Sequence, residues 1–297
     1  MAEGSRCMLC PRQCGARRSV SRGVCGCLDE LKVARAALHM WEEPCISGEK
    51  GSGAIFFSGC PLHCIFCQNR AISDGLAGKV ITIERLTEIC LSLQEQGAAN
   101  INLVTAGQYA RQIVTAIRAA KAQGLTIPII CNSGGYETVE TVMLLSEVVD
   151  AWLPDLKYLH AETAKRYSNA PDYPLTAKRA IDCMVEHAGP LSFDAAGYIK
   201  SGVIVRHLVL PGHAEEAMEI VDYLHKTYGE RIYISIMNQY TPPKEALPYK
   251  ELNRKLTRYE YDKVVRHAID LGIEQAYVQE RGTVGESFIP AFDCEGV

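Results

Sequence analysis

The sequence predicts an α/β protein: a partial (β/α)6 barrel with a cysteine-rich N-terminal extension. Its 297 residues are 47% hydrophobic, which is enough for one large core. Short apolar runs alternate with stretches of helical periodicity after residue 53, and cysteines are dense before it. We therefore expect an extension over residues 1–52 and a barrel over residues 53–297.

The barrel is expected from the order of its elements. Predicted strands are the apolar, β-branched runs 54–58, 100–104, 127–132, 151–156, 203–210, 232–237 and 275–278. Between them, apolar residues recur at the spacing of one helix face: Leu86, Ile89, Cys90 and Leu93; Ile113, Ala116, Ile117 and Ala120; Val139, Val142 and Met143; Ala217, Ile220, Val221 and Leu224. Strand and helix in alternation predict parallel βα units. Functional groups then gather at the carboxyl ends of the strands.

The extension carries enough cysteines for a metal site. Cys7, Cys10 and Cys14 form one group, and Cys25 follows with Cys27 close behind it. The four thiolates of Cys7, Cys10, Cys14 and Cys25 suit zinc or an auxiliary iron-sulfur cluster, and their spacing does not separate the two. The alternative is that these cysteines are small buried apolar side chains.

Composition argues against several other classes of protein. The net charge of -4 and the pI near 6.1, with charges dispersed along the chain, indicate no surface for bulk nucleic acid. No apolar run reaches the length of a membrane span. Residues 1–14 contain no apolar signal-peptide core. Thirteen cysteines, an odd number, suit reduced thiols and metal in a cytoplasmic protein better than a disulfide framework.

A second cysteine group directly follows the first predicted barrel strand. Cys60, Cys64 and Cys67 are spaced CxxxCxxC, and the aromatic Phe66 precedes the last of them. Three close thiolates can hold a four-iron cluster and leave one iron open for chemistry. The alternative is a structural zinc with His63 as the fourth ligand. The cluster is favoured because structural zinc sites usually take their ligands from two separate knuckles.

This motif resembles that of the radical S-adenosylmethionine (radical SAM) superfamily. The run Asp155-Leu156-Lys157 and the cysteine-rich start resemble the pyruvate formate-lyase activating enzyme-like branch. The resemblance implies a [4Fe-4S] cluster on Cys60, Cys64 and Cys67 and S-adenosylmethionine (SAM) beside it. It also implies cleavage of SAM to methionine and a 5'-deoxyadenosyl radical, with an electron donor such as flavodoxin or ferredoxin.

The resemblance and the strand ends suggest which residues bind SAM. The candidates are Phe66, Thr105, Asn132, Ser133, Asp155, Lys157, Arg206 and His207. Of the adjacent Arg206 and His207, only one can face the barrel interior. The run 102–109 departs from the Gly-Gly-Glu-Pro-like run that receives the methionine amine in many family members, since it keeps one glycine and no glutamate. Candidates for the substrate cavity are Gln108, Tyr109, Gln239 and Tyr240.

Three hypotheses for the function follow. In the first, the radical abstracts a hydrogen atom from an enclosed small molecule, a modified nucleobase or another metabolite, in a lyase or rearrangement reaction. In the second, it installs a glycyl radical on a partner enzyme of the pyruvate formate-lyase type. In the third, the chain is a non-catalytic metal-binding scaffold, which predicts no cleavage of SAM.

Overall fold

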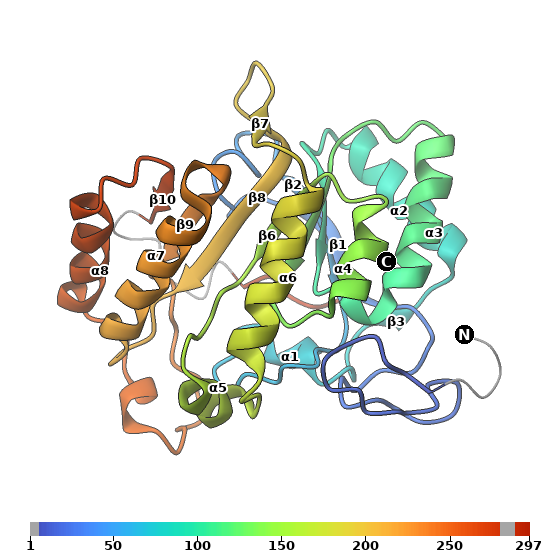
Figure 1. The fold of residues 1–297 in the computed structure, drawn as a ribbon. Coiled ribbons are helices and arrows are strands. Elements are labelled where there is room, and N and C mark those ends of the chain that lie inside the picture. The colour runs from blue at the N-terminus through green and yellow to red at the C-terminus, as the bar shows by residue number, and fades with distance from the viewer. Residues whose placement is uncertain (1–5, 280–288) are drawn as a thin grey trace.

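The computed structural model describes residues 6–279 and 289–297, and its centre is a mostly parallel, unclosed sheet (Figure 1). The strand order is β10-β9-β8-β6-β5-β4-β2-β1-β3, and β7 pairs with β8. The strands are β1 Lys32–His39, β2 Ser52–Phe57, β3 Lys79–Val80, β4 Ile101–Val104, β5 Ile129–Ser133, β6 Ala151–Pro154, β7 Ser192–Phe193, β8 Ile199–Leu208, β9 Tyr233–Met237 and β10 Ala276–Val278. From β2 to β10 along this order, every neighbouring pair is parallel, which confirms the predicted fold class.

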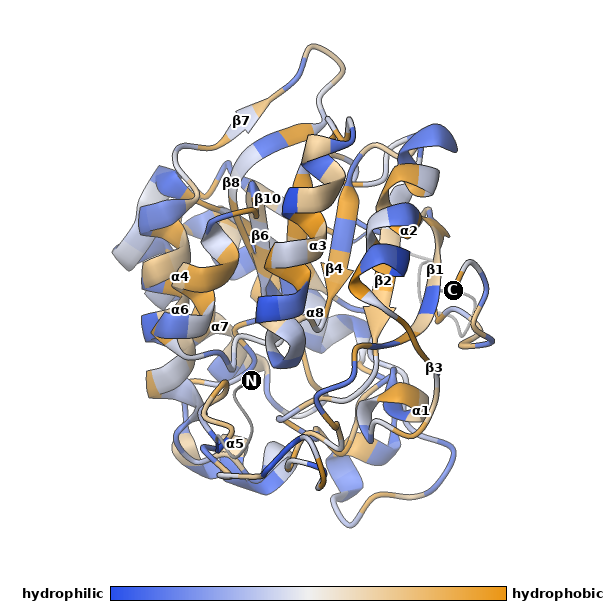
Figure 2. Ribbon diagram, turned by 90° about the vertical axis from the view of Figure 1, so that its right-hand side faces the viewer, coloured by the Kyte–Doolittle hydropathy of each residue, from blue (hydrophilic) through white to orange (hydrophobic). Residues whose placement is uncertain are grey.

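Helices follow the parallel strands and cover the outer face of the sheet (Figure 2). They are α1 Arg70–Ser73, α2 Ile83–Glu95, α3 Ala110–Ala122, α4 Val139–Ser146, α5 Ala161–Ser168, α6 Tyr173–His187, α7 Ala214–Tyr228 and α8 Arg258–Asp270, with short 3-10 turns η1 Gly107–Tyr109, η2 Gly229–Arg231 and η3 Lys250–Asn253. The predicted apolar faces of α2, α3 and α7 are buried. The prediction was wrong for Met143 on α4, which is 51% exposed, because Leu145 and Val142 provide the buried face there.

Threonine caps fix where several helices begin. Thr82 accepts a hydrogen bond from the backbone N–H of Arg85 at the start of α2. Thr138 does the same for α4, and Thr257 forms a reciprocal capping box with Glu260 at α8. Each cap satisfies a backbone donor that the first helical turn leaves free.

The predicted strands were found with shifted ends. β8 begins at Ile199, earlier than predicted, because β7 turns back and pairs with it antiparallel. β1 and β3 were not predicted. β1 pairs antiparallel with β2, so residues 32–39 of the extension are part of the main sheet. Residues 6–31 contain no helix or strand and lie as loops against the lower end of the barrel in Figure 1.

The inner face of the sheet is only partly apolar. Phe56 and Val104 lie in one inner apolar cluster, and Cys45, Ile46 and Ile204 lie in another. Between these clusters the sheet carries polar side chains, which line a cavity. No helix in the described ranges is long and apolar enough to cross a membrane.

Candidate active site

The loop after β2 brings the three predicted cluster cysteines to one cavity. Cys60, Cys64 and Cys67 all line a cavity of about 230 Å³ at the carboxyl ends of the parallel strands. The backbone N–H groups of Gly59 and Cys60 donate to the carbonyls of Ile72 and Ser73 at 2.7 and 2.9 Å. Gly59 has φ +87°, where a side chain would collide with the Cys27 sulfur. These contacts fix the start of the loop at residues 59 and 60.

The environment of the three thiols fits an iron-sulfur cluster. Burial, together with the neighbouring Cys64, raises the pKa of Cys60 to about 11 and that of Cys67 to about 12. Thiols with these pKa values are protonated at neutral pH unless a metal displaces the proton. The Ser168 hydroxyl donates to the Cys64 sulfur at 3.1 Å, a contact that also suits a metal-bound thiolate. All thirteen cysteines are free of disulfides.

Thr105 occupies an unusual conformation beside the triplet. It directly follows β4, lines the cavity and has φ +58°, a left-handed conformation that β-branched residues rarely adopt. Its N–H donates to the Asn132 carbonyl at 2.9 Å, and its carbonyl accepts from the Gln108 amide at 2.8 Å. The surrounding structure therefore imposes the strain, as often happens at functional sites.

The next two strands also end in the cavity. Asn132 and Ser133 of β5 and Asp155 after β6 line it. Lys157, two residues further along the chain, forms an ion pair with Asp155, with 2.5 Å between its Nζ and the Asp155 Oδ2. Burial tends to lower the pKa of Lys157, but Asp155 and the sulfurs of Cys64 and Cys67 outweigh burial and raise it. Lys157 therefore stays cationic beside the two sulfurs.

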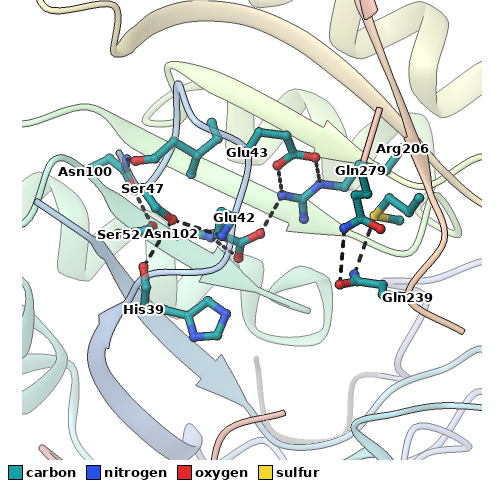
Figure 3. Close-up of polar contacts among 12 residues, drawn as sticks. His39, Glu42, Glu43, Ser47, Ser52, Asn100, Asn102, Arg206, Gln239 and Gln279 are labelled. Carbon is teal, nitrogen blue, oxygen red and sulfur yellow. Dashed lines mark hydrogen bonds and ion pairs between the residues drawn. The ribbon is translucent and has the colours of Figure 1, made fainter. Parts of the chain in front are cut away.

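Arg206 and His207 of β8 point to opposite sides. Arg206 lines the cavity, is 6% exposed and lies between two carboxylates of the extension. Its Nε donates to Glu43 at 2.9 Å and its Nη2 donates to Glu42 at 2.6 Å and also to Glu43, as Figure 3 shows. His207 instead lies in a separate small pocket, where its Nδ1 contacts the Leu156 carbonyl at 2.8 Å. Burial lowers the pKa of His207.

The remaining predicted site residues differ in their surroundings. Phe66 lines the cavity, with ring contacts to the buried Tyr240 and to a tyrosine of α5. Gln239 also lines the cavity. The Tyr240 hydroxyl donates to the Leu252 carbonyl at 2.7 Å. The side chains of Gln108 and Tyr109 are buried between the extension and β2, so we leave both out of the proposed substrate site.

Several cavity residues were not predicted from the sequence. His39, Trp41 and Glu42 come from the extension, and the acidic pair before Pro44 was their only signal in the sequence. Glu137, which lines a smaller separate pocket, follows β5 and accepts a hydrogen bond from Ser133 at 3.0 Å. Burial raises the pKa of Glu137 to about 7. No spacing rule points to Glu137, because its position beside Ser133 depends on how the turn after β5 folds back.

The N-terminal cysteines lie close to the triplet loop. Cys7 and Cys25 are buried. The sulfurs of Cys14 and Cys25 both lie 3.4 Å from the position that a Cβ atom at residue 23, a glycine, would occupy. Burial, together with the thiols of Cys7, Cys14 and Cys25, raises the pKa of Cys10 to about 12. Within residues 6–279 and 289–297, no three His, Cys, Asp or Glu side chains are arranged to hold a single metal ion. The second metal site stays a prediction.

Arginine side chains link the extension to the triplet loop. Arg12 donates through Nε to the Pro61 carbonyl at 2.9 Å and through Nη2 to the Ser168 carbonyl at 2.9 Å. Arg18 is buried over the Tyr109 ring and donates to the Gln108 carbonyl at 2.6 Å. The extension therefore packs against the loop that carries the triplet. The geometry of the extension and the geometry of the triplet depend on each other.

Comparisons with known proteins identify the family of this chain. The family model for the radical SAM superfamily matches residues 54–237. An uncharacterized protein of Methanocaldococcus jannaschii, MJ0674, is 29% identical over 279 residues, which cover 91% of this chain and 76% of that protein.

Solved structures share the fold at low identity. A radical SAM methyltransferase from Sphaerobacter thermophilus has a TM-score of 0.53 and 14% identity, over 78% of this chain and 67% of that one. SuiB from Streptococcus suis, bound to SAM, has a TM-score of 0.50 and 16% identity, over 75% of this chain and 48% of that one. With the family match over more than half of its length, the chain belongs to the radical SAM superfamily, whose cofactors are a [4Fe-4S] cluster and SAM.

Proposed function

We propose that this radical SAM enzyme acts on a small molecule enclosed in its cavity, in a lyase or rearrangement reaction of a modified nucleobase or another metabolite. When bound, the cluster and SAM supply a 5'-deoxyadenosyl radical, which abstracts a hydrogen atom from the substrate and leaves as 5'-deoxyadenosine. The observation that carries the proposal is one cavity that is lined both by the cysteine triplet and by His39, Trp41 and Glu42 of the extension.

The cofactor half of the cavity is formed by strand ends. Cys60, Cys64 and Cys67 would hold the cluster, and the turn at Thr105 would present backbone groups to the methionine part of SAM. Asp155 and Lys157 present opposite charges from one strand end, which suits a zwitterionic ligand. Asn132 and Ser133 offer hydrogen bonds to ribose hydroxyls.

Residues 40–51 cover the substrate half at the amino ends of β4 and β8. The carbonyl of Cys45 accepts from the Ile199 N–H at 2.9 Å, and that of Ile46 accepts from the Asn100 side chain at 2.7 Å. Glu43 is held by Arg206. The segment thus runs across the barrel from the start of β4 to β8, and these contacts anchor it there. This enclosure supports a small substrate, because a 5'-deoxyadenosyl radical must be shielded from solvent.

The alternative of a glycyl-radical activating enzyme is favoured by one observation. The Asp155-Leu156-Lys157 run, which resembles that of the pyruvate formate-lyase activating enzyme, lies at the cavity. An activator must admit a loop of another protein to the radical. The two proposals therefore differ in the size of the molecule that gives up the hydrogen atom.

Deuterium transfer distinguishes the hypotheses. The reconstituted enzyme is reduced anaerobically with SAM and supplied with either the small-molecule or the protein fraction of cells grown in heavy water. We expect deuterium in 5'-deoxyadenosine only with the small-molecule fraction. Transfer from the protein fraction alone would favour the activator, and no 5'-deoxyadenosine in either case would favour the scaffold. Cys64→Ala should abolish the product, and Cys183→Ala, on α6 away from the cavity, should retain it.

A further inference from the structure

Resting on the proposed function, we infer that the substrate carries a cationic, N–H-rich group, such as an amine, amidine or guanidinium, which binds Glu42 and Asn102. Glu42 lines the same cavity as the cysteine triplet. Asn102 belongs to β4, beside it. Both lie in the polar layer shown in Figure 3.

Glu42 has hydrogen-bonding capacity left for a ligand. One carboxylate oxygen accepts from the Asn102 amide at 3.0 Å and the other accepts from Arg206 at 2.6 Å. Each carboxylate oxygen can accept two hydrogen bonds. The Glu42 side chain is mostly buried, and its residue is among those that line the cavity. Glu42 is thus a fixed acceptor with room for a further donor.

Asn102 provides the second, independent observation. Its residue has no exposed surface, and its side-chain Oδ1 is a buried acceptor without a hydrogen-bond partner. Asn102 and Val104 are two residues apart on β4, so their side chains share the inner face of the sheet, and Val104 lines the cavity. Asn102 does not itself line the cavity but is hydrogen-bonded to Glu42, which does. Because buried polar atoms are normally paired, we expect its Oδ1 to accept from a ligand bound at Glu42.

The charges of the side chains around Glu42 favour a cationic ligand. Arg206 lies between Glu42 and Glu43, so these three side chains together carry one net negative charge. Asp155 and Lys157 form a neutral pair. Burial lowers the pKa of His39, so its ring adds no positive charge at neutral pH. Among the described residues, the cation nearest Glu42 is already shared by two carboxylates, which leaves little attraction for a phosphate or a carboxylate.

Three ligands of nearly the same shape test this inference. Benzamidine is cationic, benzamide is neutral and benzoate is anionic, and each is titrated by anaerobic calorimetry into the reconstituted full-length protein with SAM bound. We expect benzamidine to bind at least about tenfold more tightly than benzamide, and benzoate to bind more weakly than either, since hydrogen bonds between charged partners are the stronger ones. Equal affinities, tighter binding of benzoate, or no binding of benzamidine would overturn the inference.

A matched pair of variants locates the effect. Glu42→Gln should lower the benzamidine affinity by at least about tenfold. Glu49→Gln, the same change at an exposed position of the same segment, should leave it within about twofold, which is the range for a surface charge. Unchanged affinity in Glu42→Gln would contradict the inference, and if that variant does not fold, the comparison of the three ligands on the unaltered protein still decides.

The titration is independent of turnover. If no small molecule donates deuterium, the proposed function fails while the binding comparison can still be made. If small molecules donate deuterium and benzamidine shows no preference, only the inference about the substrate fails.

Discussion

Neutralising Glu43 should destabilise the fold, because it breaks a buried ion pair between the extension and the barrel. Glu43 is 9% exposed and accepts two hydrogen bonds from Arg206, which is 163 residues away in the sequence. Glu43→Gln keeps the shape of the side chain but leaves the Arg206 guanidinium with Glu42 as its one carboxylate partner. Removing one member of a buried pair costs about 3–5 kcal/mol, and the remaining carboxylate places this case near the lower end, at about 3 kcal/mol.

That free energy corresponds to a measurable change in Tm. With an unfolding entropy of about 2 cal/mol/K per residue, a chain of this length should lose roughly 5 °C. The assay is thermal unfolding followed by circular dichroism, with the exposed Glu49→Gln as the control. A Tm for Glu43→Gln within about 1 °C of the control would refute the reasoning, since that is the range for a surface charge.

The same pair predicts a dependence on pH. Burial tends to raise the pKa of Glu43, but Arg206 outweighs burial and lowers it below the unfolded value near 4.5. Because the folded-state pKa is the lower one, the stabilisation is present above about pH 4.5 and is lost as the pH falls through the folded-state value. Glu43→Gln should therefore show a shallower loss of stability in acid than the unaltered protein.

Three further predictions concern the cavity and the extension. Ser168→Ala removes the hydroxyl that donates to Cys64, and should lower the cluster reduction potential by roughly 40 mV, the equivalent of about 1 kcal/mol, in a redox titration. Thr105→Gly relieves the left-handed strain and should raise the free energy of unfolding by about 1 kcal/mol in urea; a loss of stability would contradict the strain argument. Cys10→Ala should lower the metal content per chain below that of the unaltered protein, and an unchanged content would remove the predicted second site.

The sequence identified those site residues that directly follow a predicted strand. The triplet, Asp155 and Lys157 could be placed because each follows a recognisable apolar run, and parallel strands bring their carboxyl ends together. β1 could not be recognised, since its run Lys-Val-Ala-Arg-Ala-Ala-Leu-His is rich in alanine and carries charges, both uncommon in strands.

Contacts between residues that are far apart in the sequence explain the other differences from the prediction. Arg206 was expected to meet a ligand, but its partners are carboxylates from a segment that shows no regular pattern in the sequence. Similarly, Tyr109 follows a strand end that the sequence places at the cavity, yet packing of Arg18 and Phe57 against its ring holds it in the core. Neither contact is encoded in the spacing of neighbouring residues.

The most direct test of the central claim is the electron paramagnetic resonance spectrum of the anaerobically reconstituted and reduced protein, recorded with and without SAM. The site around Cys60, Cys64 and Cys67 predicts the signal of a reduced [4Fe-4S] cluster that changes when SAM is added, and Cys64→Ala should lose the change while Cys183→Ala keeps it. A reduced cluster whose spectrum is unaffected by SAM, or a Cys64→Ala variant that responds as the unaltered protein does, would contradict the account.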